Sequence, residues 1–180
     1  MMVGSETMVG DLPYNWEQVK KHKAVVGDFV WSAWDYLGEA CIGDWTYHSY
    51  KGLPLLAGQG MIDITGKPLA SMYFMQVVWD MRKEPFIGVR PVNHANEKPS
   101  TGAWQFTNCI DSWNWQPYDG KRAVVEVYSQ GYKVKLVLND KVVGNKKLKK
   151  YKALFKVKYR EGTLTRLPMT RMEKNFPVIL

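Results

Sequence analysis

The 180 residues suffice for one medium-sized domain or two small ones, and 46% of them are hydrophobic, which excludes a disordered chain. No apolar run approaches the roughly 20 residues needed to span a bilayer, and no signal-peptide pattern is visible near Met1, which favours a cytoplasmic location. Residues 1–120 carry 9 basic and 13 acidic side chains, whereas residues 121–180 carry 16 basic and 4 acidic ones. We therefore expect two parts of different construction.

The first elements predict a strand, a helix and a second strand. Residues 1–3 form the end of a buried strand, and residues 14–23 a short helix with lysines in its last turn, where cations suit the helix dipole. Residues 24–31 are a continuous apolar run broken only by Gly27 and Asp28. Such runs are typical of parallel strands that are buried on both faces, so this segment predicts one βαβ unit.

A long aromatic loop follows from residue 38 to about residue 60. Its Trp45, Tyr47 and Tyr50 are expected to pack within the loop. The apolar spacing over residues 68–82 predicts a mostly buried helix. Residues 85–118 are rich in turn residues and predict a linker, within which residues 86–89 could form an edge strand.

From Ala123 onward, apolar and polar residues alternate with a period of two. Strands are expected at 123–128, 133–138 and 152–159, with a tight hairpin turn at Asn139 and Asp140. Short strands separated by turns indicate a β-sandwich of the immunoglobulin type, although three to five strands fall short of the usual seven or so. The lysines alternate with apolar residues, which favours a solvated strand face over a nucleic-acid interface.

The cysteines and histidines do not suggest a metal site. Cys41 and Cys109 are too few for a disulfide framework and are expected to be ordinary thiols. The three histidines are scattered and form no ligand pair. We expect no metal and no organic cofactor.

Three motifs carry a resemblance to a known family. Residues 3–7, Val-Gly-Ser-Glu-Thr, lead from apolar residues into a carboxylate that is expected to be buried. Residues 27–39 read GDFVWSAWDYLGE, and residues 128–144 read YSQGYKVKLVLNDKVVG. Together they resemble glycoside hydrolase family 2, the β-galactosidase and β-glucuronidase family, and the whole is most similar to a β-galactosidase.

The resemblance implies an α/β plus all-β chain: the C-terminal part of a (β/α)8 barrel in residues 1–84, a linker in 85–118 and a partial immunoglobulin-like β-sandwich in 119–180. Residues 166–180 do not fit the family pattern, and we interpret them as the product of a frameshift. The first six barrel strands, and with them an N-terminal part of the enzyme, would be missing.

The family's chemistry assigns roles to particular residues. A retaining glycosidase uses two carboxyl groups, one as nucleophile and one as acid/base. The resemblance makes Glu6 the nucleophile, places Trp31 against the sugar, and puts Trp34, Asp35 and Glu39 around the pocket. The acid/base glutamate should follow an asparagine, but the pair Asn96-Glu97 falls in the predicted linker. The chain alone is therefore expected to be inactive.

Other interpretations remain open at this point. A glutamate in a Ser-Glu-Thr tripeptide is by itself more typical of a helix cap. Trp34, Asp35 and Glu39 are as readily structural as functional. The chain could instead be a non-catalytic carbohydrate-binding or structural module, or a decayed gene product. The expected partners are a β-linked oligosaccharide or glycoside, the missing part of the enzyme and a second copy of the chain, with no nucleic acid and no membrane.

Overall fold

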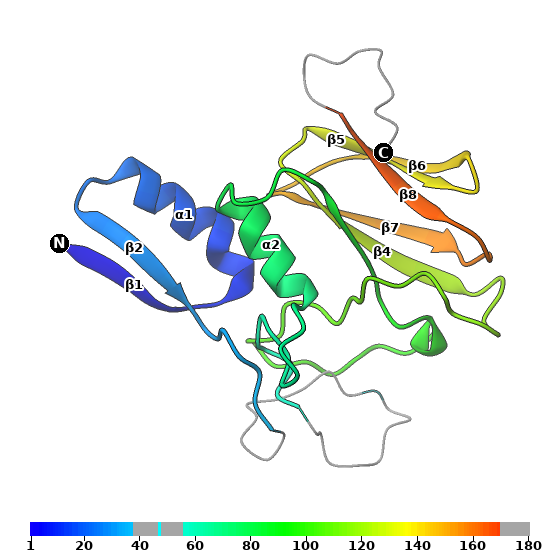
Figure 1. Ribbon diagram of the computed structural model, residues 1–180, viewed down its shortest axis with the longest axis horizontal. Helices are drawn as coiled ribbons and strands as arrows, with labels where there is room; N and C mark the ends of the chain where they lie inside the picture. Colours follow the sequence, from blue (N-terminus) through cyan, green and yellow to red (C-terminus); the bar gives the residue numbers. More distant parts are fainter. Residues whose placement is uncertain (38–46, 48–55, 170–180) are drawn as a thin grey trace. The chain divides into compact units, whose positions relative to one another are not determined.

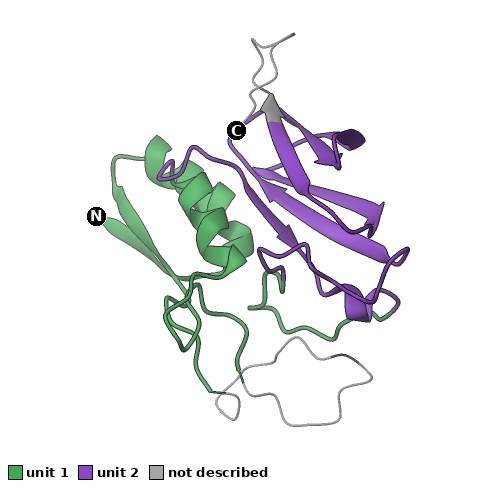
Figure 2. Ribbon diagram, turned by 45° about the vertical axis from the view of Figure 1, so that its right-hand side comes forward, with its two compact units in different colours: residues 1–79, 97–108 green, residues 80–96, 109–180 purple. Residues whose placement is uncertain are grey.

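The computed structural model describes residues 1–37, 47 and 56–169. The chain folds into two compact units, shown in Figure 2: unit 1 contains residues 1–79 and 97–108, and unit 2 contains residues 80–96 and 109–180. The segment 85–118, predicted as a linker, is thus divided between the two units. None of the helices in the described part of the chain is long and apolar enough to cross a membrane.

Unit 1 begins with the predicted βαβ arrangement (Figure 1). Strand β1 (Met2–Thr7) pairs in parallel with β2 (Val25–Val30), and the short 3-10 helix η1 (Val9–Asp11) and helix α1 (Leu12–Lys21) connect them. Proline in the first turn of α1 suits its start, where a backbone N–H has no helical partner. Lysines in the last turn complement the helix dipole, as the sequence predicted.

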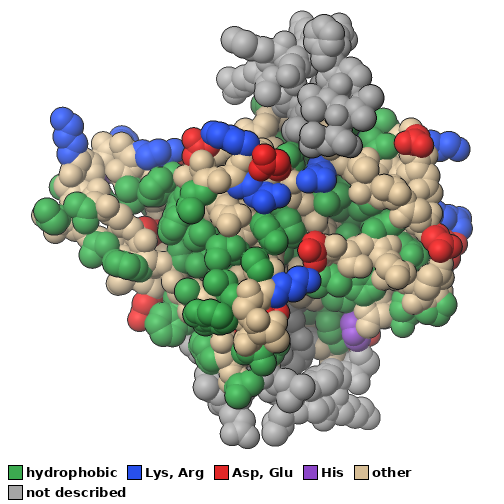
Figure 3. All heavy atoms as spheres, in the orientation of Figure 1, with side chains coloured by type: hydrophobic (Ala, Val, Ile, Leu, Met, Phe, Trp, Pro, Cys, Tyr) green, Lys and Arg blue, Asp and Glu red, His purple; other side chains and the backbone are tan. Residues whose placement is uncertain are grey.

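The predicted burial of this sheet on both faces is wrong for the described residues. The exposed fractions of Met2, Val26 and Phe29 are 60%, 58% and 67%, and Figure 3 shows apolar side chains on the surface over this end of unit 1. A parallel strand is buried on both faces only when neighbouring strands and helices cover it. Here β1 and β2 form a sheet of two strands, and the described residues do not close into a barrel.

Helix α2 (Ala70–Val78) is shorter than the predicted 68–82 because Leu69 is extended and Asp80 adopts a positive φ of 61°. The α2 side chain Phe74 stacks on Phe106 with ring centroids 4.6 Å apart. Gln105 donates a hydrogen bond from Nε2 to the carbonyl of Ala57 at 2.8 Å. Residues 97–108 are therefore part of the packing of unit 1.

Unit 2 is a sandwich of two three-stranded sheets (Figure 1). One sheet has the order β3-β4-β7 and the other β6-β5-β8, and all pairs are antiparallel. The strands are β3 (Phe86–Val89), β4 (Arg122–Tyr128), β5 (Lys133–Leu138), β6 (Lys141–Lys147), β7 (Lys152–Lys158) and β8 (Leu164–Met169); a 3-10 helix, η3 (Val92–His94), follows β3. The predicted strands and the edge strand at 86–89 are confirmed.

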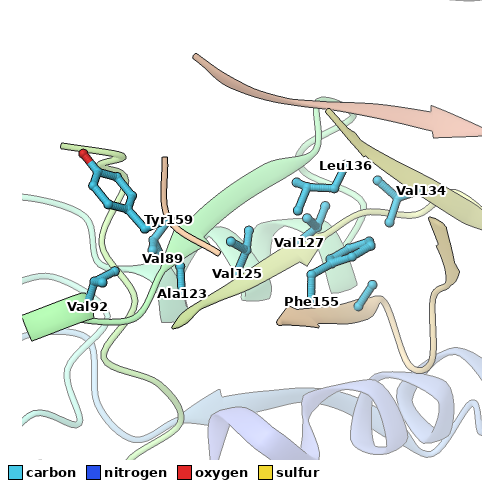
Figure 4. Close-up of a cluster of buried hydrophobic side chains, with 10 residues drawn as sticks. Val89, Val92, Ala123, Val125, Val127, Val134, Leu136, Phe155 and Tyr159 are labelled. Atoms are coloured by element: carbon cyan, nitrogen blue, oxygen red, sulfur yellow. The ribbon is translucent and has the colours of Figure 1, made fainter. Parts of the chain in front are cut away.

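The core of unit 2 lies between its two sheets, as Figure 4 shows. Val125 and Phe155 from one sheet meet Leu136 from the other, and all three are essentially inaccessible. The β5–β6 hairpin turns at Asn139 and Asp140, whose φ values of 47° and 62° are those that such a two-residue turn requires. Period-two patterning and turn residues thus predicted β4, β5, β7 and the hairpin, whereas β8 was not predicted.

The opposite face of the β3-β4-β7 sheet carries a buried ion network. Glu126 is fully buried, and its carboxylate accepts hydrogen bonds from Arg90 at 2.6 and 2.8 Å and from the Tyr128 hydroxyl at 2.7 Å. Lys152 Nζ lies 2.6 Å from its second oxygen. Burial raises the pKa of Glu126, but the charges of Lys152 and Arg90 outweigh it, and the pKa lies below its ordinary value.

The proposed frameshift region begins inside a regular strand. Residues 166–169 belong to β8 and pair with β5, and Arg166 donates two hydrogen bonds to the carbonyl of Pro85, at 2.6 and 3.1 Å. Residues 170–180 lie outside the described residues. The origin of the tail therefore stays a prediction.

Candidate functional site

The carboxyl ends of β1 and β2 bring together two of the predicted site residues. Glu6 is the next-to-last residue of β1, and Trp31 directly follows β2. The Trp31 backbone N–H donates to the carbonyl of Thr7 at 3.0 Å, which fixes the two strand ends against each other. Ligand sites of parallel α/β structures form at such carboxyl ends.

The backbone at Glu6 is irregular. The register between β1 and β2 shifts between Gly4 and Thr7, and Glu6 has a φ of 55°. A non-glycine residue in this left-handed region is uncommon, and such residues cluster at functional sites. The carboxylate itself is exposed in the described structure, so the expectation that it is buried is wrong. The bulge turns Glu6 out of the strand's regular alternation.

Three polar side chains support the end of β1. The Thr7 hydroxyl donates to Asp28 Oδ1 at 2.5 Å and accepts from Asn15 Nδ2 of α1 at 2.9 Å. Asp28 Oδ2 is buried and has no hydrogen-bond partner among the described residues. These positioning residues were not predicted from the sequence, although Asp28 is the one charge within the apolar run of residues 24–31.

Trp31 forms an aromatic corner with a residue that the sequence analysis did not single out. Its ring centroid lies 6.4 Å from that of Trp104, and the two ring planes are inclined at 58°. Trp31 is 38% exposed. Trp104 lies in the segment that was predicted to be a linker. The presence of a tryptophan in that segment was the sequence signal that could have identified it as a candidate site residue. Trp34 is more exposed, at 56%, and its backbone bridges to Ile62.

Asp35 has a structural position. It is buried, and its carboxylate accepts the backbone N–H groups of Gly58 at 3.1 Å and Gly60 at 3.3 Å. A Cβ at Gly60 would lie 2.3 Å from the Asp35 backbone nitrogen, so only glycine fits there. Asp35 therefore anchors the returning loop. Glu39 lies outside the described residues.

Tyr47 accepts a hydrogen bond from Asn108 Nδ2 at 2.6 Å, in keeping with the predicted loop packing, whereas Trp45 and Tyr50 lie outside the described residues. Cys109 is a buried free thiol, as predicted, and Cys41 is outside the described part. No group of His, Cys, Asp and Glu within the described residues could hold a metal ion.

Comparisons with known proteins identify the structures that this chain resembles. A family called "Domain of unknown function (DUF4982)" matches residues 120–167, and no curated protein matches the chain. Two crystal structures of glycosyl hydrolase family 2 members from Bacteroides cellulosilyticus are similar to 95% of this chain, with TM-scores of 0.72 and 0.76 and identities of 25% and 28%. The predicted relationship to glycoside hydrolase family 2 is confirmed.

The similarity covers only part of those enzymes. The chain spans 21% and 23% of the length of the two Bacteroides cellulosilyticus proteins. A β-glycosidase from Bacteroides vulgatus shares the fold over 88% of this chain and 16% of its own, at 20% identity and a TM-score of 0.54. A β-glucuronidase of family 2 shares it over 91% and 14%, at 19% identity and a TM-score of 0.54. These last two likenesses show a shared fold.

Proposed function

We propose that this chain supplies the nucleophile side of the active site of a retaining glycoside hydrolase that removes terminal β-linked sugars. The position of Glu6 carries the proposal: it lies at the carboxyl end of a parallel strand, and backbone hydrogen bonding joins that end to Trp31. In this proposal β1 and β2 are the last two strands of a (β/α)8 barrel, and α2 is its closing helix. Residues outside these 180 provide the other strands.

The reaction proceeds in two steps. The Glu6 carboxylate attacks the anomeric carbon, the glycosidic bond breaks, and an acid group about 5–5.5 Å away protonates the leaving oxygen. The same group then takes a proton from water, and the water oxygen releases the sugar from its ester with Glu6. The Trp31 and Trp104 rings pack against the apolar C–H face of the sugar. The bulge at Glu6 and the hydrogen bonds of Thr7 hold the carboxylate in position.

The acid/base group comes from elsewhere in this proposal. No Asn-Glu pair lies at a described strand end; Asn96-Glu97 follows η3. General acid catalysis contributes roughly 10²–10⁴-fold in rate, and the isolated chain also lacks most of the sugar pocket. We expect it to have no meaningful activity. Galactosides are the first substrates to test, and glucuronides the second because a relative in fold is named a β-glucuronidase.

Replacement of one glutamate tests the proposal. The test uses a chimera, in which residues 1–180 replace the matching segment of the Bacteroides cellulosilyticus glycosyl hydrolase. The rest of that enzyme is expected to supply the acid/base group. A fluorosugar that forms a stable glycosyl ester should label Glu6, as read by mass spectrometry of peptides. Glu6→Gln should lower kcat about 10³-fold or more. Glu17→Gln, an exposed carboxylate of α1, is the matched control and should leave kcat unchanged. A folded Glu6→Gln chimera with full activity would contradict the assignment.

The exposed β1–β2 sheet indicates where the chain would associate with a partner. Both edges and much of the apolar surface of β1 and β2 are uncovered by described residues. An exposed strand edge is a template for pairing with another chain. We expect the isolated chain to self-associate in sedimentation, and replacing Val3 and Phe29 by serine to reduce that association. A monodisperse wild-type monomer would contradict this expectation.

A second candidate function is sugar binding without catalysis. The partly exposed Trp31, Trp34 and Trp104 favour it, because aromatic rings bind sugar faces without any carboxylate chemistry. The variant Glu6→Gln distinguishes the two functions. If the chain is a binding module, the 180-residue variant should keep its affinity for sugar. A chain that neither binds sugar nor gives an active chimera would be the decayed gene product.

A further inference from the structure

Two strands of unit 2 carry a high density of lysine. Residues 141–158 contain eight lysines and no aspartate or glutamate. Within the described residues, Lys152 is the one of these eight that pairs with a carboxylate, that of Glu126. The other seven are exposed, and we call them the basic edge: Lys141, Lys146, Lys147, Lys149, Lys150, Lys156 and Lys158.

The basic edge is continuous across the two sheets. Strand β6 is the edge of one sheet and β7 the edge of the other. Lys146 Nζ, on β6, donates to the carbonyl of Leu154, on β7, at 2.7 Å, so the two edges adjoin. Paired backbone hydrogen bonds between Lys149 and Lys152 close the turn between them. Seven exposed lysines therefore lie on two adjoining edge strands and the turn that joins them.

Two cross-strand pairs add like charges directly opposite each other. Lys133 opposes Lys147 in the β5–β6 pair, and Arg122 opposes Lys158 in the β4–β7 pair. Lysines on an edge strand do protect it from pairing with other chains. Directly opposed like charges, however, destabilise a sheet and add nothing to that protection. A polyanion lying along the basic edge would relieve this repulsion.

We propose that the basic edge binds an acidic polysaccharide, one whose sugars carry carboxylate or sulfate groups. The choice of a saccharide rests on the proposed glycosidase function. Lysine point charges fit it better than nucleic acid, because the edge contains no arginine to grip phosphate with two parallel hydrogen bonds. The nearby Tyr132 is a single ring with Lys147 Nζ 5.3 Å from its centroid, whereas single-stranded nucleic acid typically stacks on several aromatic rings.

Matched charge variants of the full 180-residue chain test this inference. Binding to polygalacturonate, heparin and neutral dextran would be measured by calorimetry at low and high salt. The edge variant is K147Q/K149Q/K150Q. The control K20Q/K21Q/K23Q removes the same charge from exposed lysines at the end of α1. Affinity for a polyanion should fall about tenfold in the edge variant and stay within about twofold in the control.

The ligands that bind, and the variant that loses affinity, determine whether the basic edge recognises an acidic polysaccharide. Binding to heparin alone identifies sulfate as the recognised group, and binding to polygalacturonate identifies carboxylate; salt should weaken both. The inference is overturned if neither polyanion binds, if the two variants lose affinity equally, or if a single-stranded oligonucleotide binds more tightly than either polysaccharide. Labelling of Glu6 in the chimera does not involve the basic edge, so a failure of the proposed catalysis is distinguishable.

Discussion

The two units of this chain differ in how completely they enclose their own apolar residues. Unit 2 places Val125, Leu136 and Phe155 between two sheets and excludes water from them. In unit 1, apolar strand residues such as Val26 and Phe29 remain exposed on a sheet of two strands. Unit 1 does bury other apolar residues, such as Leu12 and Phe74, so the difference lies in its two-stranded sheet. The β1–β2 sheet of unit 1 thus leaves apolar side chains in contact with water, whereas the two sheets of unit 2 enclose a core between them.

The largest stability contrast should come from one phenylalanine in each unit. Phe155→Ala removes a ring from the sandwich core and should lower the free energy of unfolding by about 3–5 kcal/mol. Phe29→Ala, at a 67% exposed position, should change it by less than about 0.5 kcal/mol. Urea denaturation followed by far-ultraviolet circular dichroism measures both. Equal losses at the two positions would contradict the comparison.

Disrupting the buried ion network should lower the free energy of unfolding only slightly less than Phe155→Ala does. Glu126→Gln removes the buried carboxylate charge that Arg90 and Lys152 share and should lower the free energy of unfolding by about 3 kcal/mol or more. Asp119→Asn is the control, because the Asp119–Arg160 pair is exposed and contributes little. If the two variants are equally stable, the network is not structural.

Acidification should report on the same carboxylate. Because the pKa of Glu126 is lowered on folding, its contribution is complete above the unfolded-state pKa, near 4.5, and is lost as the pH falls through the lower folded-state value. Between pH 7 and about pH 4.5, Glu126 therefore adds no pH dependence to the free energy of unfolding. The Glu126→Gln variant should lose less stability than the wild type on acidification below pH 4.5. Parallel acid titrations of both proteins, followed by circular dichroism, check the sign.

The aromatic corner in unit 1 should give the smallest effect. In the chimera, Trp104→Ala removes one ring beside Trp31 and should raise KM about threefold to tenfold with little change in kcat. Trp104→Phe keeps an aromatic face and should restore most of the affinity. Steady-state kinetics of the two variants measure this. An unchanged KM in Trp104→Ala would place that ring outside the sugar site.

The sequence by itself determined the local structure of both units. Alternation predicted β4, β5 and β7, and the residues Asn139 and Asp140 predicted their hairpin, because a period of two and turn chemistry are local properties. Local patterns also predicted the βαβ order of unit 1, because they depend on residues close to one another in the chain. Glu6 and Trp31, in contrast, were singled out by the resemblance to glycoside hydrolase family 2.

Only the tertiary structure decided the features that join distant residues. Trp104 meets Trp31 from 73 positions away, Asp35 is anchored by the backbone at Gly58 and Gly60, and Arg90 reaches Glu126 across 36 positions. No local pattern encodes such contacts, because they depend on how loops return to the strands. The apolar run of β2 by itself predicted burial on both faces, and the observed exposure arises because an apolar run does not specify the elements that would cover it.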